Sequence, residues 1–345
     1  MAGGTQQRLG TASDLMGLVH NGLMSQAICI AAELHITDLL ASGCGNVDEL
    51  ACATGTHAPS LHRLLRALIS LKLCVERDDG SFALGPMGSL LLSDAPDSLR
   101  SWILWCGKYQ WPIWGNLLYS VTTGESARKL AVGTEGFGHL ECDPNAAAIF
   151  NGAMTELTRL IASELLRAYD FAGMRRVIDI GGGHGALIAA VLETHPGLHG
   201  VVYDLPHAIE GAQAHLAREG MLERCDFIAG DFFAAVPGGA DAYLLKNVIH
   251  DWNDERSAAI LRNCRSAMPL TGRLVLVERI MPDRLEASSW NHRAVAWADL
   301  TMMLGTGGCQ RTEAEFRTLL ASSGFVLTKV IPTSLEYSVL EAVPG

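Results

Sequence analysis

The stretch Val177-Ile178-Asp179-Ile180-Gly181-Gly182-Gly183-His184-Gly185 decides the fold. An apolar run of strand type leads there into a glycine loop, and a helical pattern follows over residues 185–194. Glycines let the backbone turn tightly and let a ligand approach the amide nitrogens at the start of the helix. The stretch therefore predicts the first strand, loop and helix of an α/β ligand-binding domain.

The glycine loop by itself fits two kinds of ligand. Gly181-x-Gly183-x-x-Ala186 satisfies the dinucleotide fingerprint. Asp179-x-Gly181-x-Gly183-x-Gly185 equally fits an S-adenosylmethionine loop, in which an acid precedes the first glycine by two residues. Asp204, at the end of the next strand, can accept both ribose hydroxyls of either ligand, so it indicates an adenosine-type ligand without choosing between them.

Strand-like runs alternate with helical segments from residue 173 onward. The predicted strands are 176–180, 200–203, 226–228, 242–246 and 273–277, and the predicted helices lie near 185–194, 206–218, 255–268 and 312–323. This alternation predicts a mostly parallel sheet with helices on both faces. The last two predicted strands, 325–331 and 337–342, are close enough in sequence to form an antiparallel pair at the edge of the sheet.

Residues 1–100 form a second predicted domain. Apolar residues recur at helical spacing over 13–34 but cover more than one face, which predicts that a partner covers the second face. Two shorter helices follow, and residues 73–84 read as a hairpin around Asp78-Asp79-Gly80. Helix, helix, hairpin is a winged-helix order, which suits either DNA binding or dimerisation. The few fixed positive charges on the second short helix favour dimerisation.

Composition limits the partners and the compartment. The 345 residues include 26 Lys and Arg against 37 Asp and Glu, a net charge of −11, which makes nucleic acid a poor partner. No segment approaches twenty uninterrupted apolar residues, so no membrane span is expected. Nine cysteines without a Cys-x-x-Cys pair, and no export signal, indicate the cytoplasm. His57 and His62 lack companions at ligand spacing, so no metal site is expected.

Residues 101–172 are predicted to be a helical linker that also supplies part of a substrate pocket. The helix over 144–168 leads into the domain at 173–345. Five aromatic residues crowd together in this segment, at Trp102, Trp105, Tyr109, Trp111 and Trp114. Aromatic residues at such spacing usually fill a core, and the alternative is a wall for a flat aromatic ligand.

Further residues at the ends of the predicted strands decide between the two ligands. They form blocks that resemble the S-adenosylmethionine-dependent O-methyltransferases, the family of the plant caffeic acid and hydroxyindole enzymes and of bacterial antibiotic-tailoring enzymes. The blocks are Asp179 to Gly185, Tyr203-Asp204-Leu205-Pro206, Gly230-Asp231-Phe232-Phe233, His250-Asp251-Trp252, Glu278 and Gly307-Gly308-Cys309-Gln310-Arg311-Thr312. The resemblance runs from about residue 13 to the C-terminus. It implies a Rossmann-like methyltransferase sheet behind an N-terminal winged-helix-like dimerisation domain.

The resemblance also implies roles for residues around the cofactor, S-adenosylmethionine. Gly181 and Gly183 would face its methionine part, Asp204 the ribose, and Asp231 and Phe232 the adenine, with Trp252 against the adenine and Lys246 at the strand end beside it. Asp179 and Leu205 are also implied to bind the cofactor. The alternatives from the residues themselves are that Phe232 and Trp252 are core aromatics and that Asp231 caps a turn.

His250 matches the family's catalytic base. A phenolic hydroxyl has a reference pKa near ~10 and imidazole near ~6.5, so a histidine can take the proton as the oxygen attacks the sulfonium methyl in line. Glu278 would hold the other ring nitrogen. Many relatives have a second carboxylate in the Gly-Gly-x-Glu-Arg-Thr run, where this chain has Gln310, which can form a hydrogen bond but carries no charge.

The substrate side is implied by the same resemblance. Phe150, Asn151 and Met154 match the helix that lines the site, Met302 and Met303 lie in a further predicted helix, and Asp251 stands beside the base. We expect a cytoplasmic homodimer that methylates a hydroxyl of a small aromatic molecule in secondary metabolism, including antibiotic biosynthesis. The alternatives are a cofactor-binding relative that hydroxylates, decarboxylates or methylates at nitrogen or carbon, and a winged-helix regulator that senses a ligand.

Overall fold

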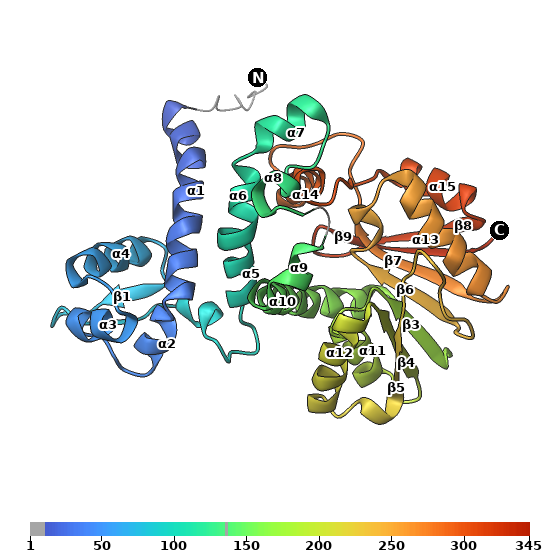
Figure 1. Ribbon diagram of the computed structural model, residues 1–345, viewed down its shortest axis with the longest axis horizontal. Helices are drawn as coiled ribbons and strands as arrows, with labels where there is room; N and C mark the ends of the chain where they lie inside the picture. The colour runs from blue at the N-terminus through green and yellow to red at the C-terminus, as the bar shows by residue number, and fades with distance from the viewer. Residues whose placement is uncertain (1–10, 135–136) are drawn as a thin grey trace, which may run out of the picture. The chain divides into compact units, whose positions relative to one another are not determined.

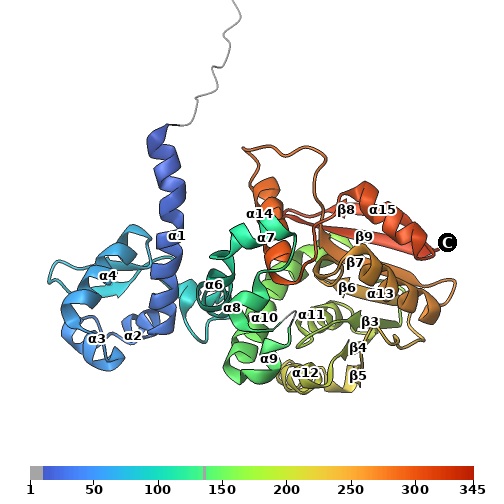
Figure 2. The same ribbon diagram turned by 45° about the horizontal axis from the view of Figure 1, so that its top comes forward.

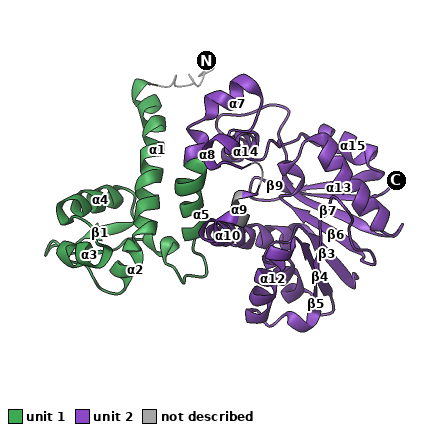
Figure 3. Cartoon of the chain, viewed as in Figure 1, with its two compact units in different colours: residues 1–111 green, residues 112–345 purple. Residues whose placement is uncertain are grey.

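The computed structural model describes residues 11–134 and 137–345. The chain divides into two compact units, residues 1–111 and 112–345 (Figure 3). Each unit is described by itself. The division into three segments with boundaries near residues 100 and 172 stays a prediction.

The first unit is helical with one small hairpin. Its elements are α1 (Ala12–Glu33), α2 (Ile36–Ala41), α3 (Val47–Thr54), α4 (Ala58–Ser70), β1 (Cys74–Glu76), β2 (Phe82–Leu84), η1 (Gly88–Leu91), α5 (Arg100–Leu104) and the π-helical turn η2 (Trp105–Gln110). Strands β1 and β2 pair antiparallel. The predicted order of helix, helix, hairpin is thus present in α3, α4 and β1–β2, whereas its winged-helix classification stays a prediction.

Helix α1 presents apolar side chains to solvent along most of its length. Its exposed large apolar residues are Leu15, Met16, Leu18, Val19, Leu23, Met24 and Ile30. Among the helices that the structure describes, α1 alone is long and apolar enough to cross a membrane by length and composition. A single helix of this kind near the N-terminus is weak evidence for a membrane protein, because helices with other roles pass the same test.

The second unit begins with short helices and one long helix. These are α6 (Trp111–Trp114, at the boundary of the units), α7 (Leu117–Thr123), α8 (Arg128–Val132), α9 (His139–Cys142) and α10 (Pro144–Ala168). Asp143 begins α10 because its side chain accepts hydrogen bonds from the backbone of Asn145 and Ala146. Pro144 occupies the first turn of α10, where a missing N–H costs nothing.

A seven-stranded sheet fills the rest of the second unit. Its elements in chain order are β3 (Arg176–Ile180), α11 (Ala186–Thr194), β4 (His199–Asp204), α12 (Pro206–Arg218), η3 (Leu222–Arg224), β5 (Cys225–Ala229), β6 (Ala242–Lys246), η4 (Ile249–Asp251), α13 (Asp254–Ala267), β7 (Arg273–Arg279), α14 (Trp290–Gly305), α15 (Glu313–Ser322), β8 (Phe325–Pro332) and β9 (Tyr337–Pro344). The strand order is β5-β4-β3-β6-β7-β9-β8. Strands β3 to β7 pair parallel, and β9 pairs antiparallel with β7 and β8. The predicted mostly parallel sheet with an antiparallel edge pair is therefore confirmed.

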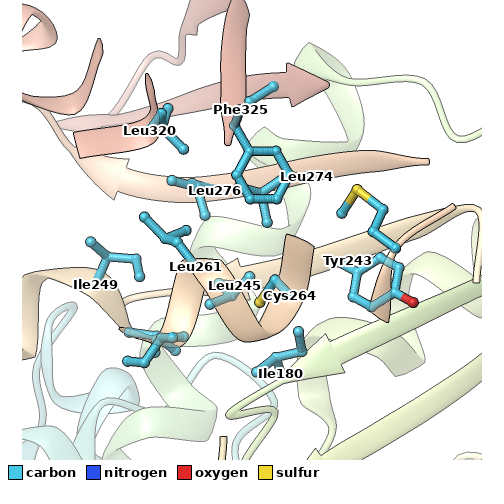
Figure 4. Close-up of a cluster of buried hydrophobic side chains, with 14 of the residues drawn as sticks. Ile180, Tyr243, Leu245, Ile249, Leu261, Cys264, Leu274, Leu276, Leu320 and Phe325 are labelled. Carbon is cyan, nitrogen blue, oxygen red and sulfur yellow. The ribbon is translucent and has the colours of Figure 1, made fainter. Parts of the chain in front are cut away.

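Alternate residues of the strands face two separate apolar cores. Ile178 and Leu245 face one core with α13 and α15, and Figure 4 shows its tight packing around Leu261, Leu276 and Phe325. Val177 and Leu244 face the other core with α10, α11 and α12. Figure 1 and Figure 2 show these two helical layers on opposite faces of the sheet. Apolar residues at both the odd and the even positions of these strands therefore bury both faces of the sheet.

The order of the strands reverses between β3 and β6. From β3 the chain proceeds outward to β4 and β5, whereas from β6 it proceeds to β7 on the other side. Loops at the carboxyl ends of two such strands diverge and leave a crevice, where open α/β sheets bind ligands. The glycine loop follows β3 and the His250 segment follows β6, so the topology places both at this crevice.

Candidate active site

His250 lies in the short turn η4 directly after β6, next to the end of β7. Its Nδ1 atom is 3.2 Å from Oε2 of Glu278, the sixth residue of β7. The other carboxylate oxygen, Oε1, accepts hydrogen bonds from the backbone N–H groups of Val248 and Ile249, at 3.1 and 2.9 Å. Glu278 is therefore held by the same turn that carries the histidine, which fixes the carboxylate at the ring nitrogen.

Gln310 lies on the same side of the imidazole. Its Nε2 atom is 3.3 Å from Nδ1 of His250, and its backbone N–H donates to Oδ1 of Asp299 at 2.7 Å. Gln310 and Glu278 thus both face Nδ1. A proton on Nδ1 donated to Glu278 leaves Nε2 as the free acceptor, and a turn of the amide about its last torsion angle offers Oε1 of Gln310 to the same proton.

Burial and the surrounding cations favour the neutral form of His250. Burial lowers the pKa of His250 well below its usual value of 6.5, and the cations Arg279, Lys246 and Arg311 lower it further. Burial also raises the pKa of the Glu278 carboxyl to about 7. A neutral imidazole can accept a proton, which is the state that a general base needs.

Asp251 follows the histidine and faces its other ring nitrogen. Its Oδ1 atom is 3.8 Å from Nε2 of His250. Burial raises the pKa of Asp251 to about 7, although the nearby guanidinium of Arg128 opposes the rise. Asp251 therefore lies at the Nε2 edge of the imidazole, opposite the edge occupied by Glu278 and Gln310.

The glycine loop after β3 depends on backbone conformations that favour glycine. Gly181, Gly183 and Gly185 have φ angles of 68°, 55° and 73°, in the left-handed region. A Cβ atom on Gly181 would lie 2.9 Å from Cγ2 of Val248 in the segment after β6. The glycine at 181 therefore allows the loop after β3 to approach the loop that carries His250.

Two acidic residues hold or underlie the glycine loop. Oδ2 of Asp204 accepts a hydrogen bond from Gly183 N at 2.7 Å, and Oδ1 accepts one from Leu205 N at 2.6 Å. Asp179 is 2% exposed, and its Oδ2 atom has no hydrogen-bond partner among the described residues. Burial raises the pKa of Asp179 to about 7, which a bound cation would lower.

The aromatic residues expected near the adenine form one cluster. The ring of Trp252 meets those of Phe232 and Phe233 edge to face, with centroids 6.3 and 4.9 Å apart. Asp231 is exposed and accepts a hydrogen bond from Phe233 N, so it does cap a turn. Lys246 ends β6, where burial lowers the pKa of its amine and Asp179 and Glu278 oppose the lowering.

The residues expected on the substrate side lie on two helices of the second unit. Phe150, Asn151 and Met154 are half-buried on α10, where the ring of Phe150 lies 5.6 Å from that of Phe137. Met302 and Met303 are half-buried near the end of α14. Helix α14 also carries Asp299, which binds the backbone of Gln310. A shared pocket of α10 and α14 residues with His250 stays a prediction.

Arg311 belongs to the block from Gly307 to Thr312, but the sequence predicts no role for it. Arg311 is 2% exposed and contacts the backbone on both sides of His250. An arginine followed by Thr and Glu is typical of a surface segment. The only sequence signal for a role of Arg311 was its position next to Gln310.

Among residues 11–134 and 137–345, no group of three His, Cys, Asp or Glu side chains is arranged to hold a metal ion.

Comparison with family models identifies both parts of the chain. Residues 16–94 match the O-methyltransferase dimerisation domain, and residues 114–326 match the O-methyltransferase domain. The chain is 40% identical to the phenazine O-methyltransferase PhzM of Lysobacter antibioticus, over 96% of each chain. It is 38% identical to the O-demethylpuromycin-O-methyltransferase of Streptomyces alboniger, over 98% of this chain and 90% of that one.

Solved structures agree with these sequence matches. The crystal structure of LaPhzM superposes with a TM-score of 0.93 at 39% identity and covers 98% of this chain and 100% of that chain. The neocarzinostatin O-methyltransferase NcsB1, solved with S-adenosylmethionine and 2-hydroxy-5-methyl naphthoic acid, has a TM-score of 0.78 at 31% identity and covers 93% and 96% of the two chains. A phenazine-1-carboxylate N-methyltransferase of Pseudomonas aeruginosa is 30% identical over 97% and 98% of the two chains. The chain belongs to the O-methyltransferase family.

Proposed function

We propose that this O-methyltransferase transfers a methyl group from S-adenosylmethionine to a hydroxyl of a small aromatic molecule, with His250 as general base. The observation that carries the proposal is the buried pair of His250 and Glu278, 3.2 Å apart, beside the glycine loop at the crevice of the sheet. A pair of this kind is the arrangement that a histidine base needs in order to keep one tautomer.

The residues of the crevice suit S-adenosylmethionine, the cofactor of the family. When bound, it supplies an electrophilic methyl group on a positively charged sulfur. Asp179 offers a buried carboxylate oxygen without a hydrogen-bond partner among the described residues, which suits a positively charged ligand. Gly181 and Gly183 leave room for close approach to the loop, and Asp204 stands where it can accept ribose hydroxyls. Phe232 and Trp252 would border the adenine.

His250 would activate the acceptor hydroxyl. As the hydroxyl oxygen attacks the methyl carbon, its proton passes to Nε2 of His250, the C–O bond forms and the C–S bond breaks. Glu278 keeps the Nδ1 proton in place and stabilises the imidazolium that results. A positioned general base of this kind contributes about 10² to 10⁴ in rate. The remaining acceleration would come from alignment of oxygen, carbon and sulfur.

Two observations support a homodimer, and a third supports a cytoplasmic location. The family model of the dimerisation domain spans residues 16–94, and α1 exposes an apolar face that a second copy would bury. All nine cysteines are free thiols in the structure, which suits a reducing compartment.

Methylation at nitrogen is a second candidate, because a relative that is 30% identical is an N-methyltransferase. An uncharged ring nitrogen needs no base to remove a proton before it attacks. If this chain were to methylate nitrogen, replacing His250 would therefore cost little activity.

The test is a screen with methyl-labelled S-adenosylmethionine against phenols, hydroxyquinones, aromatic polyketides and hydroxyphenazines. We expect label in at least one O-methylated product, identified by mass spectrometry. Calorimetry should show binding of S-adenosylmethionine and none of NAD. Tight NAD binding without binding of the methyl donor would overturn the proposal.

A further inference from the structure

Five backbone groups around His250 are held by side chains or by another loop. Glu278 accepts from Val248 N and Ile249 N, and Cys309 N donates to the carbonyl oxygen of His250 at 3.0 Å. The other two of the five groups are the carbonyl oxygens of Ile249 and Trp252, which flank His250 and Asp251. Their charged donor is Arg311, to which the proposed mechanism gives no role.

Arg311 supplies these donors from inside the protein. Its Nη1 donates to Ile249 O at 3.1 Å and its Nη2 donates to Trp252 O at 2.8 Å. The hydroxyl of Ser257 lies 3.2 Å from each of the same two carbonyl oxygens, and its single proton can serve one of them at a time. Ile249 O also accepts from Trp252 N at 3.3 Å, whereas Arg311 gives both carbonyls a charged donor. The planar fork of Arg311 reaches both carbonyls at once from separate nitrogens and still offers an N–H to a third acceptor.

That third acceptor is Asp254 at the first turn of α13. Nε and Nη2 of Arg311 both contact Oδ1 of Asp254, at 2.9 and 2.8 Å. The side chain of Asp254 is 82% exposed, whereas that of Arg311 is 2% exposed. The buried positive charge is thus balanced by a carboxylate that stands in water and that does not touch His250.

We infer that Arg311, anchored by Asp254, is a positioning residue that fixes the turn carrying His250. The inference rests on the proposed role of His250. Arg311 acts through the backbone on both sides of the histidine, and its charge also lowers the pKa of the imidazole. The chain therefore connects an exposed acid to the catalytic histidine through one buried guanidinium.

The charges that face His250 determine the direction of the effect. Arg279, Lys246 and Arg311 are the cations, Glu278 and Asp251 are the acids, and Gln310 is neutral. Loss of the Asp254 carboxylate leaves the charge of Arg311 less compensated. The pKa values of both His250 and Glu278 then fall, and the acid limb of the pH-rate profile moves to lower pH.

The test variant is Asp254→Asn, and Glu255→Gln is the matched control because Glu255 is the next exposed acid on α13. We expect Asp254→Asn to lower kcat by about three- to tenfold and to move the acid limb downward. The stoichiometry of S-adenosylhomocysteine binding, measured by calorimetry, should stay at one per chain. Glu255→Gln should match the wild type in all three measurements.

A second variant separates the charge of Arg311 from its geometry. Arg311→Lys keeps the positive charge but loses the fork, so kcat should fall while the acid limb stays in place. The inference is wrong if Asp254→Asn matches Glu255→Gln in kcat and in pH profile. It is also wrong if the activity of Asp254→Asn falls only in proportion to its binding stoichiometry for S-adenosylhomocysteine while the acid limb of its pH-rate profile stays in place. That result would show that part of the protein is misfolded and that the folded part works as the wild type does. Full activity of His250→Ala would instead overturn the proposed function.

Discussion

Replacing Glu278 by glutamine tests how the proposed base, His250, is supported. In Glu278→Gln the amide oxygen can keep the two backbone hydrogen bonds from Val248 and Ile249, so the turn should stay folded. The amide NH₂ then replaces Oε2, the atom 3.2 Å from Nδ1 of His250. The carboxylate charge is lost, and an N–H donor now faces Nδ1, which favours the tautomer with its proton on Nε2.

The expected loss follows from the contact removed, a carboxylate oxygen that lies 3.2 Å from Nδ1 of His250 and can accept its proton. A hydrogen bond to a charged group contributes about 1.5 to 3 kcal/mol, which corresponds to about 13- to 160-fold in kcat. Gln310→Ala removes a neutral hydrogen bond to the same nitrogen, about 0.5 to 1.5 kcal/mol, or about 2- to 13-fold. Because burial raises the pKa of Glu278 to about 7, its carboxylate is populated mainly above that pH. The gap between the two variants should therefore be wider at pH 8 than at pH 6.

The assay is the initial rate of methyl transfer from labelled S-adenosylmethionine, with the affinity for S-adenosylhomocysteine as a control for folding. A third variant, Gln310→Glu, adds a carboxylate beside the imidazole and should move the acid limb of the profile upward. Equal losses in Glu278→Gln and Gln310→Ala would refute the reasoning. Superimposed pH profiles of Gln310→Glu and the wild type would also refute it, because position 310 would then not sense His250.

Three further predictions concern the cofactor, stability and assembly. Asp204→Ala should weaken S-adenosylmethionine binding by about 1 to 3 kcal/mol in calorimetry, and an unchanged Kd would exclude a ribose contact. Burial raises the pKa values of Asp179, Asp251 and Glu278 to about 7, above the 3.8 to 4.5 of unperturbed groups, so the folded chain holds more protons than the unfolded chain between those pH values. The free energy of unfolding should therefore decrease as pH rises from about 4 to 7. In urea titrations, the free energy of unfolding of Asp179→Asn should decrease less over this pH range than that of the wild type. Light scattering at micromolar concentration should show a dimer for the wild type. It should show a monomer for Val19→Glu, because Val19 on α1 is 69% exposed in the single chain and would lie in the dimer interface. A monomeric wild type would contradict the predicted dimer.

The sheet was predictable because each strand carries its own signal. Apolar residues fill both faces of strands such as β3 and β6. Gly181 follows β3 and Asn247 follows β6, both with positive φ, and the predicted bounds of the two strands agree with the structure. Strands β4 and β7 extend further than expected, to Asp204 and Arg279, because polar residues continue the pairing at their ends. The carboxyl ends of strands are where polar site residues are expected, so this extension includes Asp204 and Glu278.

Other features depend on contacts that no local pattern reports. The pairing of Arg311 with Asp254 joins residues 57 positions apart, and neither residue has an apolar neighbourhood that would predict burial of the arginine. The π-helical turn at Trp105–Gln110 likewise follows from tertiary packing, since these residues are compatible with an ordinary helix. The proximity of Glu278 to His250 was expected only from the family resemblance, because two strand ends become neighbours through the order of the strands.

The most direct test of the account is the comparison of His250→Ala with the wild type in turnover and in cofactor binding. The side chain of His250 contacts Glu278 and Gln310, whereas the cofactor contacts are assigned to the loops after β3, β4 and β5 and to Lys246 and Trp252. The variant should therefore bind S-adenosylmethionine with nearly the wild-type Kd while its turnover falls by about 10² to 10⁴. The loss should shrink for acidic phenols, which already ionise near neutral pH. Parallel loss of cofactor binding and turnover would contradict the account and make His250 a structural residue.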